Sequence, residues 1–397
     1  MTQEITMEEV AKCLDITIKH DEANKIITFL CMLSAYTEDS QFNISFNAPS
    51  SAGKTYIATE VAKLFPKEDV ELMSKVSPTA LFHRTKQHKS EEDYIVDLER
   101  KIIIFLDQSS YESLKALRPI LSHDQKETTF SFTDRTQKSG LRTIKAIIRG
   151  FPAVINCTAN PVFDEQEATR FLTISPEATQ DKIHTSIELT LKKESDKDSF
   201  NKAVENDPAR TRLKRRIQQV KGFGCKNIKI NESDSLILRE KFFADKDRLR
   251  LQHQRDIKWL TGIIKANALL NFPYREFEGK TITVHLEDIK TGFALWQQIA
   301  ENRELNISPI ALSMFKQDIK PLWAERKRDS RDLGITRAQI VAHHSKYGES
   351  SLTQRSLGDL LDMLVTAGLI RKESSVKDRR ITLIYPLTNS QDKTYTP

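Results

Sequence analysis

The segment 48–55 reads APSSAGKT and combines residue types that can bind phosphate groups. Backbone amides of small residues, followed by a helix N-terminus, can surround phosphate oxygens. Gly53 lets the backbone approach closely, the Lys54 ammonium can reach the β- and γ-phosphates, and the Thr55 hydroxyl can bind Mg²⁺. The pattern is typical of a P-loop. We predict that the whole segment contributes to a nucleotide site: Ala48, Pro49, Ser50, Ser51, Ala52, Gly53, Lys54 and Thr55.

The sequence on either side of this segment supports the interpretation. QFNISFNA (41–48) predicts a short strand, and KTYIATEVAKLF (54–65) predicts a helix that ends before Pro66. Ala48 stands where the usual pattern has a glycine, which is acceptable if its φ angle is negative. The alternative is a chance Gly-Lys-Thr in a loop, which does not account for the flanking strand and helix.

An acidic residue follows the next strongly apolar stretch. Asp107 comes directly after KIIIFL (101–106), which suits a strand buried on both faces of a parallel sheet. Open α/β sheets bind ligands at the carboxyl ends of their strands, and a carboxylate there can hold Mg²⁺ through water. Any strand can end in aspartate, but the upstream P-loop favours the functional interpretation. We therefore predict ATP and Mg²⁺ as cofactors, with Thr55 and Asp107 at the metal.

The next residue, Gln108, is unusual for a nucleotide hydrolase of this kind. Most such ATPases have a glutamate there, which polarises the attacking water. A glutamine amide can orient water but cannot accept its proton. Because glutamine positions the water in some nucleotide hydrolases, slow hydrolysis and no hydrolysis both stay open.

The remaining pattern predicts an α/β fold in several parts. Strand-like and helical stretches alternate over 40–175, which indicates a largely parallel sheet. Residues 128–150 predict a β-hairpin with its tip near DRTQKSG (134–140), and FPAVINC (151–157) predicts a buried strand. We predict an N-terminal helical segment (1–39), a nucleotide-binding core (40–190), a helical region (191–326) and a C-terminal module (327–397).

Two short segments beyond the hairpin resemble a known family. NCTANP (156–161) and EATRF (167–171) resemble the minichromosome maintenance (MCM) branch of AAA+ helicases, which has an Asn-Pro after the sensor-1 strand and a Ser-Arg-Phe segment with an arginine finger. The resemblance implies that Asn160 is the sensor-1 residue near the γ-phosphate. It also implies that Arg170 is the finger offered to a neighbouring subunit. Asn156 and Thr158 remain alternatives to Asn160.

Other segments extend this resemblance over about 5–300. The hairpin at 128–150 resembles the pre-sensor hairpin of such helicases, and HQRDIKWLTGIIKA (253–266) resembles the sensor-2 helix of the lid. The resemblance implies that Arg255 is the sensor-2 arginine, with Arg248, Arg250 and Lys258 as alternatives. LFPKEDVELMSKVSPTALF (64–82), LRPILSHD (117–124) and SPEATQDKI (175–183) are similar to MCM-like helicases of plasmids, phages and integrated elements, in which the ATPase often follows a primase-like region.

The same comparison implies how the parts work together. It implies an AAA+ core with a helical lid, assembled as a homo-oligomeric ring, with a hexamer as the expected size. No primase region is recognisable here, so the resemblance implies priming by a separate protein.

Two regions carry basic residues suited to DNA. Basic side chains at a hairpin tip can neutralise phosphates without sequence preference, although an ordinary solvated hairpin has the same composition. These residues are Arg135, Lys138, Arg142 and Lys145. The run Arg210, Arg212, Lys214, Arg215 and Arg216 could also touch DNA, but such a run is more often a solvated helix face.

The C-terminal region 334–387 has the pattern of a winged helix-turn-helix. Leu357, Leu360, Leu361 and Leu364 share one helical face, and Gly368 is the expected C-cap. A polar N-terminal turn and a basic hairpin would face DNA. The expected contacts are Gln354, Arg355, Lys377, Arg379 and Arg380. Such modules also mediate protein contacts.

Composition excludes several classes. With 39% hydrophobic and 29% charged residues and a net charge of +6, the chain reads as an ordinary globular protein. No apolar run is long enough to span a bilayer, and the acidic N-terminus does not resemble a signal peptide. Four scattered cysteines fit reduced, buried thiols of a cytoplasmic protein.

The favoured function is ATP-driven translocation on DNA, or its unwinding, during replication of a mobile element. One alternative is a nucleotide-gated DNA-binding protein, such as an origin-melting or loading factor, that hydrolyses ATP slowly or not at all. Gln108 favours that alternative. The other is a transcriptional regulator dominated by its winged helix.

Overall fold

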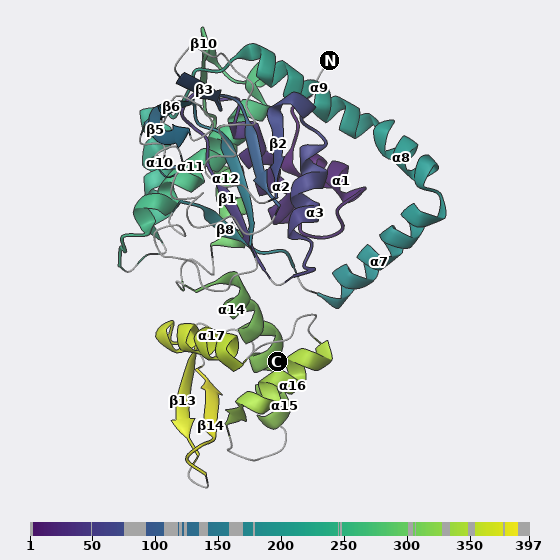
Figure 1. The fold of residues 1–397 in the computed structure, drawn as a ribbon, viewed down its shortest axis with the longest axis vertical. Helices are drawn as coiled ribbons and strands as arrows, with labels where there is room; N and C mark the ends of the chain where they lie inside the picture. Colours follow the sequence, from purple (N-terminus) through teal and green to yellow (C-terminus); the bar gives the residue numbers. More distant parts are fainter. Residues whose placement is uncertain are drawn as a thin grey trace.

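The computed structural model covers residues 1–397 and describes 3–48, 50–74, 93–106, 118, 121–122, 125–134, 142–158, 170–177, 179–244, 246, 248–300, 305, 307–327, 334–347, 354–375 and 378–387. Figure 1 shows a large upper body built around the parallel sheet and a smaller lower part, with β13 and β14, that ends the chain.

A parallel five-stranded sheet forms the centre of the upper body. Its strand order is β2-β4-β7-β1-β8, and every neighbouring pair is parallel. The strands are β1 (Ile44–Asn47), β2 (Val70–Met73), β4 (Ile102–Phe105), β7 (Ala153–Thr158) and β8 (Leu172–Ile174). The predicted α/β class and the strands expected at 41–48, 101–106 and 151–157 are therefore confirmed.

Strand β4 illustrates why these segments fold as central strands. Ile102 and Ile104 join the core beneath the helices, whereas Ile103 and Phe105 join a second core on the opposite face. A strand exposes alternate side chains to opposite faces, so an unbroken apolar run requires cover on both.

Helices cover one face of this sheet. α2 (Glu22–Ser34) and α3 (Lys54–Ala62) both contact the sheet, and α1 (Met7–Asp15) packs on α2. α1 begins with a capping box in which the Thr6 hydroxyl accepts from the Glu9 amide and the Glu9 carboxylate accepts from the Thr6 amide.

A second sheet covers the other face. It contains β3 (Asp93–Asp97), β6 (Arg142–Arg149) and β5 (Glu127–Asp134) in the order β3-β6-β5. β5 and β6 pair antiparallel along their whole length, which confirms the predicted hairpin, and its tip lies outside the described residues. In the chain this hairpin is inserted between β4 and β7.

Three helices after β8 form an arm on one side of the body. They are α7 (Gln180–Ser195), α8 (Lys197–Glu205) and α9 (Pro208–Phe223). Neither α7 nor α8 has a buried residue, whereas α9 buries Leu213, Ile217 and Val220 against the body. Figure 1 shows α7 and α8 projecting away from the sheet before α9 returns to it. Residue 190, where we predicted a division of the chain, lies inside α7.

The helical region after the arm shares the main core with the sheet. Its elements are β9 (Asn227–Lys229), α10 (Glu232–Ala244), α11 (His253–Leu270), β10 (Phe277–Glu278), β11 (Thr281–Thr283) and α12 (Leu286–Ile299), with a 3₁₀ turn at Phe272–Tyr274. Another 3₁₀ turn, Lys67–Asp69, lies between α3 and β2. α11 packs on α2 and α12. Asp288 is fully buried, accepts from Arg275 and Asn267, and thereby ties α12 to α11.

The C-terminal part has its own hydrophobic core. Its elements are α14 (Pro309–Met314), the π-helix η3 (Phe315–Ile319), α15 (Lys320–Lys327), β12 (Ile335–Thr336), α16 (Arg337–Tyr347), α17 (Gln354–Thr366), β13 (Ile370–Ser374) and β14 (Thr382–Pro386). The strands form an antiparallel sheet, β12-β14-β13. Leu357, Leu360, Leu361 and Leu364 are buried as the helical spacing predicted, and Gly368 follows α17 at φ +71°.

The predictions about the cysteines and about membrane spans can be compared with the described residues. All four cysteines are buried free thiols. None of the helices in the described part of the chain has both the length and the hydropathy to cross a membrane.

Candidate nucleotide-binding site

The segment 48–55 forms a tight turn between β1 and α3. β1 is buried along its length, and α3 begins at Lys54. Gly53 adopts φ +88° immediately before the helix, a conformation that glycine accepts without strain. Pro49 lies outside the described residues. The turn therefore aims the first amides of α3 at the space beyond the carboxyl end of β1, as phosphate binding requires.

Lys54 is held inside this turn. Its ammonium donates to the Ala48 carbonyl at 2.7 Å, and the residue is only 9% exposed. Burial lowers the pKa of the Lys54 ammonium because the charged form loses hydration. A bound polyphosphate would offset that loss with negative charge, so the side chain is suited to an anionic ligand.

Thr55 connects the turn to the strand that precedes Asp107. Its hydroxyl donates to the Leu106 carbonyl at 3.2 Å. Leu106 is the last described residue before Asp107, and its amide donates to the Met73 carbonyl at 2.8 Å. The carboxylate of Asp107 and the amide of Gln108 lie outside the described residues. The backbone nevertheless brings the Thr55 hydroxyl next to the residue that precedes the predicted metal carboxylate.

A cavity of about 300 Å³ opens at this position. It is lined by Ser50, Ser51, Gly53, Lys54, Thr55, Tyr56, Leu106 and Cys157. Burial raises the pKa of the Cys157 thiol to about 11, although the Thr55 hydroxyl opposes this shift, so the thiol stays protonated at neutral pH. Hydroxyl and carbonyl oxygens beside an ammonium suit a phosphate chain with a hard cation such as Mg²⁺.

The sheet register brings three chain segments to the same edge. Asn47 is paired with Thr158, and Phe105 with Asn156, at the carboxyl ends of β1, β7 and β4. Asn156 and Thr158 are both buried, and the Asn156 amide donates to the Ser45 hydroxyl at 3.4 Å. Asn160 follows β7 outside the described residues. The P-loop and the segments leading to Asp107 and Asn160 thus leave the sheet side by side.

Sequence reasoning missed a second cation at the P-loop. Lys182, in the first turn of α7, is 12% exposed at its side chain and forms an ion pair with the fully buried Asp21. Its ammonium also donates to the carbonyls of Ala52 at 3.3 Å and Glu177 at 2.9 Å. The same nitrogen lies 4.0 Å from where a Cβ on Gly53 would be. The position of Lys182 in a polar helix does not indicate this contact in the sequence. The contact depends on how the backbone runs from β8 to α7.

A larger cavity of about 620 Å³ adjoins the turn. Its wall includes Ser50–Gly53 of the turn, the loop residues Thr17, Ile18 and Asp21, and one side of α7. Met314, Asp318 and His344 of the C-terminal part also line it. The space is large enough for the base and ribose of a nucleotide whose phosphates occupy the turn.

Arg170 lies at the opposite edge of the sheet from the P-loop. It precedes β8, whose first residue Leu172 pairs with Ile44 at the start of β1, whereas the P-loop follows the end of β1. The Arg170 Nε donates to the Ser122 hydroxyl at 2.9 Å. Arg170 is therefore separated from the P-loop of its own chain by the length of β1.

Arg255 lies exposed on α11 and lines neither of the two cavities described above. Its alternatives Arg248 and Arg250 line a different cavity, near the start of α11. The assignment of Arg255 as the sensor-2 arginine therefore stays a prediction. Among the residues described at the P-loop, Lys182 is the cation that accompanies Lys54.

The basic residues predicted to meet DNA are described only in part. Lys145 is exposed on β6, while Arg135, Lys138 and the Arg142 side chain lie outside the described residues. In the C-terminal part, Arg379 and Arg380 are exposed, and Arg380 Nε pairs with Asp378 at 3.1 Å. The side chains of Gln354 and Arg355, and the whole of Lys377, lie outside the described residues.

The basic run at 210–216 differs from expectation. Arg210 is only 2% exposed and Arg216 only 4%, whereas Arg215 is exposed. The interpretation of the run as a solvated helix face is wrong for these two residues, because α9 turns them toward the body of the molecule. Arg216 donates to the Leu270 carbonyl at 2.8 Å.

Comparison with known proteins agrees with the geometry of the turn. No curated protein matches the chain at a significant level. The model of the MTBMA_p00010 P-loop domain family matches residues 4–218, more than half of the chain, from before α1 into α9. This range includes the five-stranded sheet, the turn with Lys54 and Thr55, and the arm. The chain therefore belongs to the MTBMA_p00010 P-loop domain family and carries the fold of a nucleotide-binding P-loop protein.

Proposed function

We propose that this protein is an ATP-dependent DNA translocase or helicase of the AAA+ class, acting as an oligomeric ring in replication of a mobile element. One observation carries the proposal. The β5–β6 hairpin is inserted between β4, which leads to Asp107, and β7, which leads to Asn160, so the hairpin that would contact DNA joins two segments of the proposed ATP site. A shift of the residues around the nucleotide can therefore be transmitted along the backbone to the hairpin.

The residues of the turn would divide the work of holding Mg²⁺-ATP. The α3 amides and Lys54 would bind the phosphates, and Thr55 with Asp107 would hold the metal, which neutralises developing charge during phosphoryl transfer. Asn160 would contact the γ-phosphate. Lys182 now pairs with Asp21, and its ammonium would bind a phosphate from the other side of the turn when that phosphate replaces Asp21 as its partner.

The other parts would contribute to DNA binding and regulation. Within the predicted region 191–326, the elements from β9 to α12, which share the main core, would serve as the lid. The C-terminal part would act as a winged helix, with α17 as the recognition helix and β13–β14 as the wing, because α17 buries its leucine face and leaves its polar face outward. Such a module can instead contact another protein or regulate transcription. Its charge pattern alone does not distinguish these roles from DNA binding in a helicase.

Replacing Lys182 with Gln is expected to weaken ATP binding about tenfold, the effect of losing one charge-assisted hydrogen bond in a partly solvated site. The loss should be smaller for AMP, which lacks the outer phosphates. Lys192→Gln, an exposed position on the same helix, serves as the control. Calorimetry would measure both affinities. If Lys182→Gln weakens ATP and AMP binding equally, Lys182 stabilises the fold through its ion pair with Asp21 and does not bind the outer phosphates.

Reversing charge in the hairpin, with Lys138→Glu and Arg142→Glu, is expected to weaken DNA binding and lower its salt dependence. Each lost phosphate contact should reduce the slope of log K against log salt by about one. The double variant Lys197→Glu and Lys202→Glu on exposed α8 changes the net charge equally and should have little effect. A salt slope that stays the same in the hairpin variant would exclude the hairpin from the DNA interface.

Gln108 favours a second candidate function, a nucleotide-gated DNA-binding switch. For a motor, we expect slow but measurable turnover that DNA stimulates, because the loose transition state mainly needs positioning and charge stabilisation. Gln108→Glu should then raise the rate or leave it similar. No hydrolysis by the natural protein with any DNA, together with hydrolysis by Gln108→Glu, would establish the switch.

A further inference from the structure

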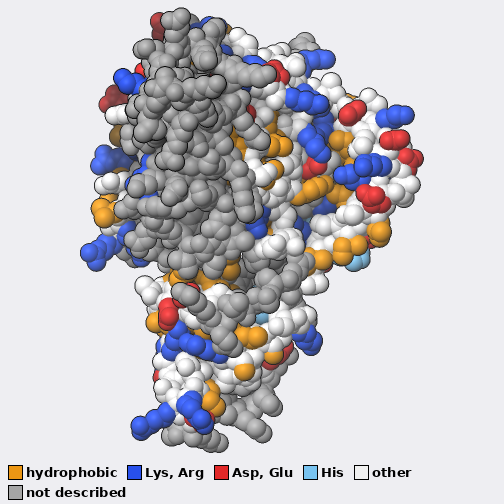
Figure 2. Space-filling view, in the orientation of Figure 1, with side chains coloured by type: hydrophobic (Ala, Val, Ile, Leu, Met, Phe, Trp, Pro, Cys, Tyr) orange, Lys and Arg blue, Asp and Glu red, His pale blue; other side chains and the backbone are white. Residues whose placement is uncertain are grey.

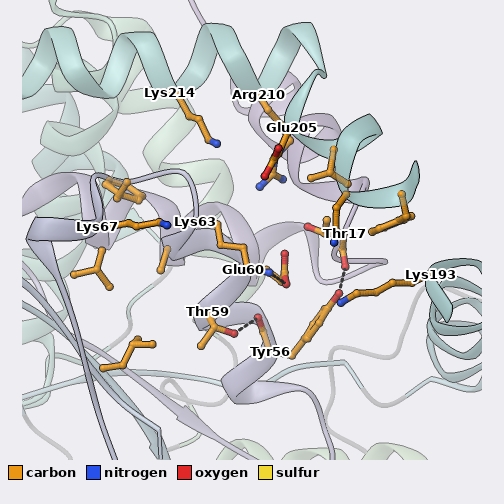
Figure 3. A pocket seen from close by; sticks show the side chains of 17 residues that line it. Thr17, Tyr56, Thr59, Glu60, Lys63, Lys67, Lys193, Glu205, Arg210 and Lys214 are labelled. Carbon is orange, nitrogen blue, oxygen red and sulfur yellow. Dashed lines mark hydrogen bonds and ion pairs between the residues drawn. The ribbon is translucent and has the colours of Figure 1, made fainter. Parts of the chain in front are cut away.

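A separate cavity of about 630 Å³ lies between α3 and the arm (Figure 3). Five basic and two acidic side chains line it. Figure 3 shows Lys63 and Lys67 reaching it from α3 and the turn after it, Lys193 from α7, and Arg210 and Lys214 from α9. One of the acids, Glu60, is already paired with Lys63. The remaining charge in the cavity is positive, which predicts an anionic ligand.

Arg210 provides the strongest evidence that this cavity is a built site. The residue is 2% exposed, and its Nη1 atom is buried without a hydrogen-bond partner. Its charge acts on the Tyr56 phenol and the Cys13 thiol, whose pKa values burial raises to about 12 and about 11, so both are neutral at pH 7. Figure 3 shows that the acid Glu205 lies beside the same guanidinium. A buried guanidinium nitrogen without a hydrogen-bond partner is costly unless an acceptor, such as a phosphate oxygen, joins it.

Apolar side chains form the rest of the wall. Phe65 follows α3, Phe200 and Val204 come from α8, and Leu72 on the edge strand β2 is 48% exposed. Figure 2 shows hydrophobic side chains beside Lys and Arg on the arm side of the molecule. A ligand that fits this wall therefore has a flat apolar part next to its negative charge.

We propose that this cavity binds a nucleoside phosphate, with its phosphate at Arg210 and Lys214 and its base against Phe65 and Phe200. The ligand is either a free nucleotide or the terminal nucleotide of a polynucleotide strand, because both present the same chemistry. This site is distinct from the P-loop, although it shares Thr17, Tyr56 and Lys193 with the larger cavity beside the P-loop. The Tyr56 hydroxyl donates to the Thr17 carbonyl at 2.8 Å between them. The inference does not depend on ATP hydrolysis.

The test measures binding to the full chain with Lys54→Ala, so that the P-loop site does not contribute. The probes for calorimetry are ADP, pyrophosphate and a short 5′-phosphorylated single-stranded oligonucleotide. We expect one ADP site per chain, or an oligonucleotide affinity that depends on Arg210. Adding Arg210→Gln should weaken binding about 10- to 100-fold, as for the loss of a charge-assisted hydrogen bond in a buried site.

Two controls separate binding from folding. Arg215→Gln removes the same charge from an exposed position on the same helix and should leave affinity within about twofold, as expected for a surface charge. Arg210→Gln should keep or raise the melting temperature of the free protein, since it removes a buried guanidinium nitrogen that has no hydrogen-bond partner. If Arg210→Gln does not fold, the half-buried Lys214→Gln takes its place.

The outcomes distinguish this site from the P-loop site. If Arg210→Gln weakens oligonucleotide binding and leaves ADP binding unchanged, a strand end is the source, and the reverse would identify free nucleotide. Two ADP sites in the wild type and one in Lys54→Ala would support both sites. One site in the wild type and none in Lys54→Ala would refute this inference and leave the P-loop intact. Pyrophosphate binding as tightly as ADP, or equal affinity in Arg210→Gln and Arg215→Gln, would also overturn it.

Discussion

Replacing Lys54 with Ala is expected to remove tight Mg²⁺-ATP binding at the P-loop while the protein remains folded. The Lys54 ammonium donates to the Ala48 carbonyl of the turn, so the change removes charge without opening a hydrophobic core. Two lost hydrogen bonds to phosphate oxygens, at about 1.5–3 kcal/mol each, predict a loss of roughly 100-fold or more.

The measurement is best made with Arg210→Gln also present, so that only the P-loop contributes. Calorimetry with Mg²⁺-ATP would give the affinity, and circular dichroism would report the fold. Lys202→Ala, on the exposed face of α8, is the matched control. An unchanged affinity in a folded Lys54→Ala protein would remove the basis for the nucleotide site.

Replacing Arg170 with Ala is expected to reduce ATP hydrolysis by about 10³- to 10⁵-fold, the range for loss of an arginine finger. The reason is geometric. Arg170 lies beyond the amino end of β8, whereas the P-loop lies beyond the carboxyl end of β1, and the two strands are parallel. Arg170 can serve a P-loop only if a neighbouring subunit presents that P-loop to it, as in a ring with head-to-tail contacts.

Mixing variants tests this arrangement directly. An Arg170→Ala subunit keeps its P-loop, and a Lys54→Ala subunit keeps its finger. If subunits mix at random around a ring, roughly a quarter of the interfaces regain both groups. Activity should therefore reappear in the mixture but in neither variant alone. A protein that stays monomeric with ATP and DNA at every concentration, or a mixture that assembles without regaining activity, would contradict the role of Arg170.

The central sheet could be predicted because local pattern and burial agree there. Ile102 to Phe105 are apolar at every position, and strands with two covered faces require that. The P-loop was equally readable, because the turn chemistry of Gly53 and the start of α3 are encoded in neighbouring residues. The hairpin followed from two alternating stretches around a polar tip.

The remaining site residues depend on contacts between distant parts of the chain. Lys182 reaches the P-loop only because Asp21, in the loop before α2, holds it there. Arg210 belongs to a basic run whose burial is decided by how α9 packs on the body. Periodicity and motif spacing contain no information about either contact. Asp107, Gln108 and Asn160 lie outside the described residues, so their assignments stay predictions.

The most direct test of the central claim is strand displacement by the purified wild-type protein, measured together with ATP hydrolysis, with and without DNA. The account predicts that DNA stimulates hydrolysis, that strands separate only when ATP is hydrolysed, and that Lys54→Ala does neither. The contrary result is a wild-type protein that binds ATP and DNA tightly, does not hydrolyse ATP faster with DNA and does not separate strands. That result would contradict the proposal that the protein is an ATP-driven DNA motor.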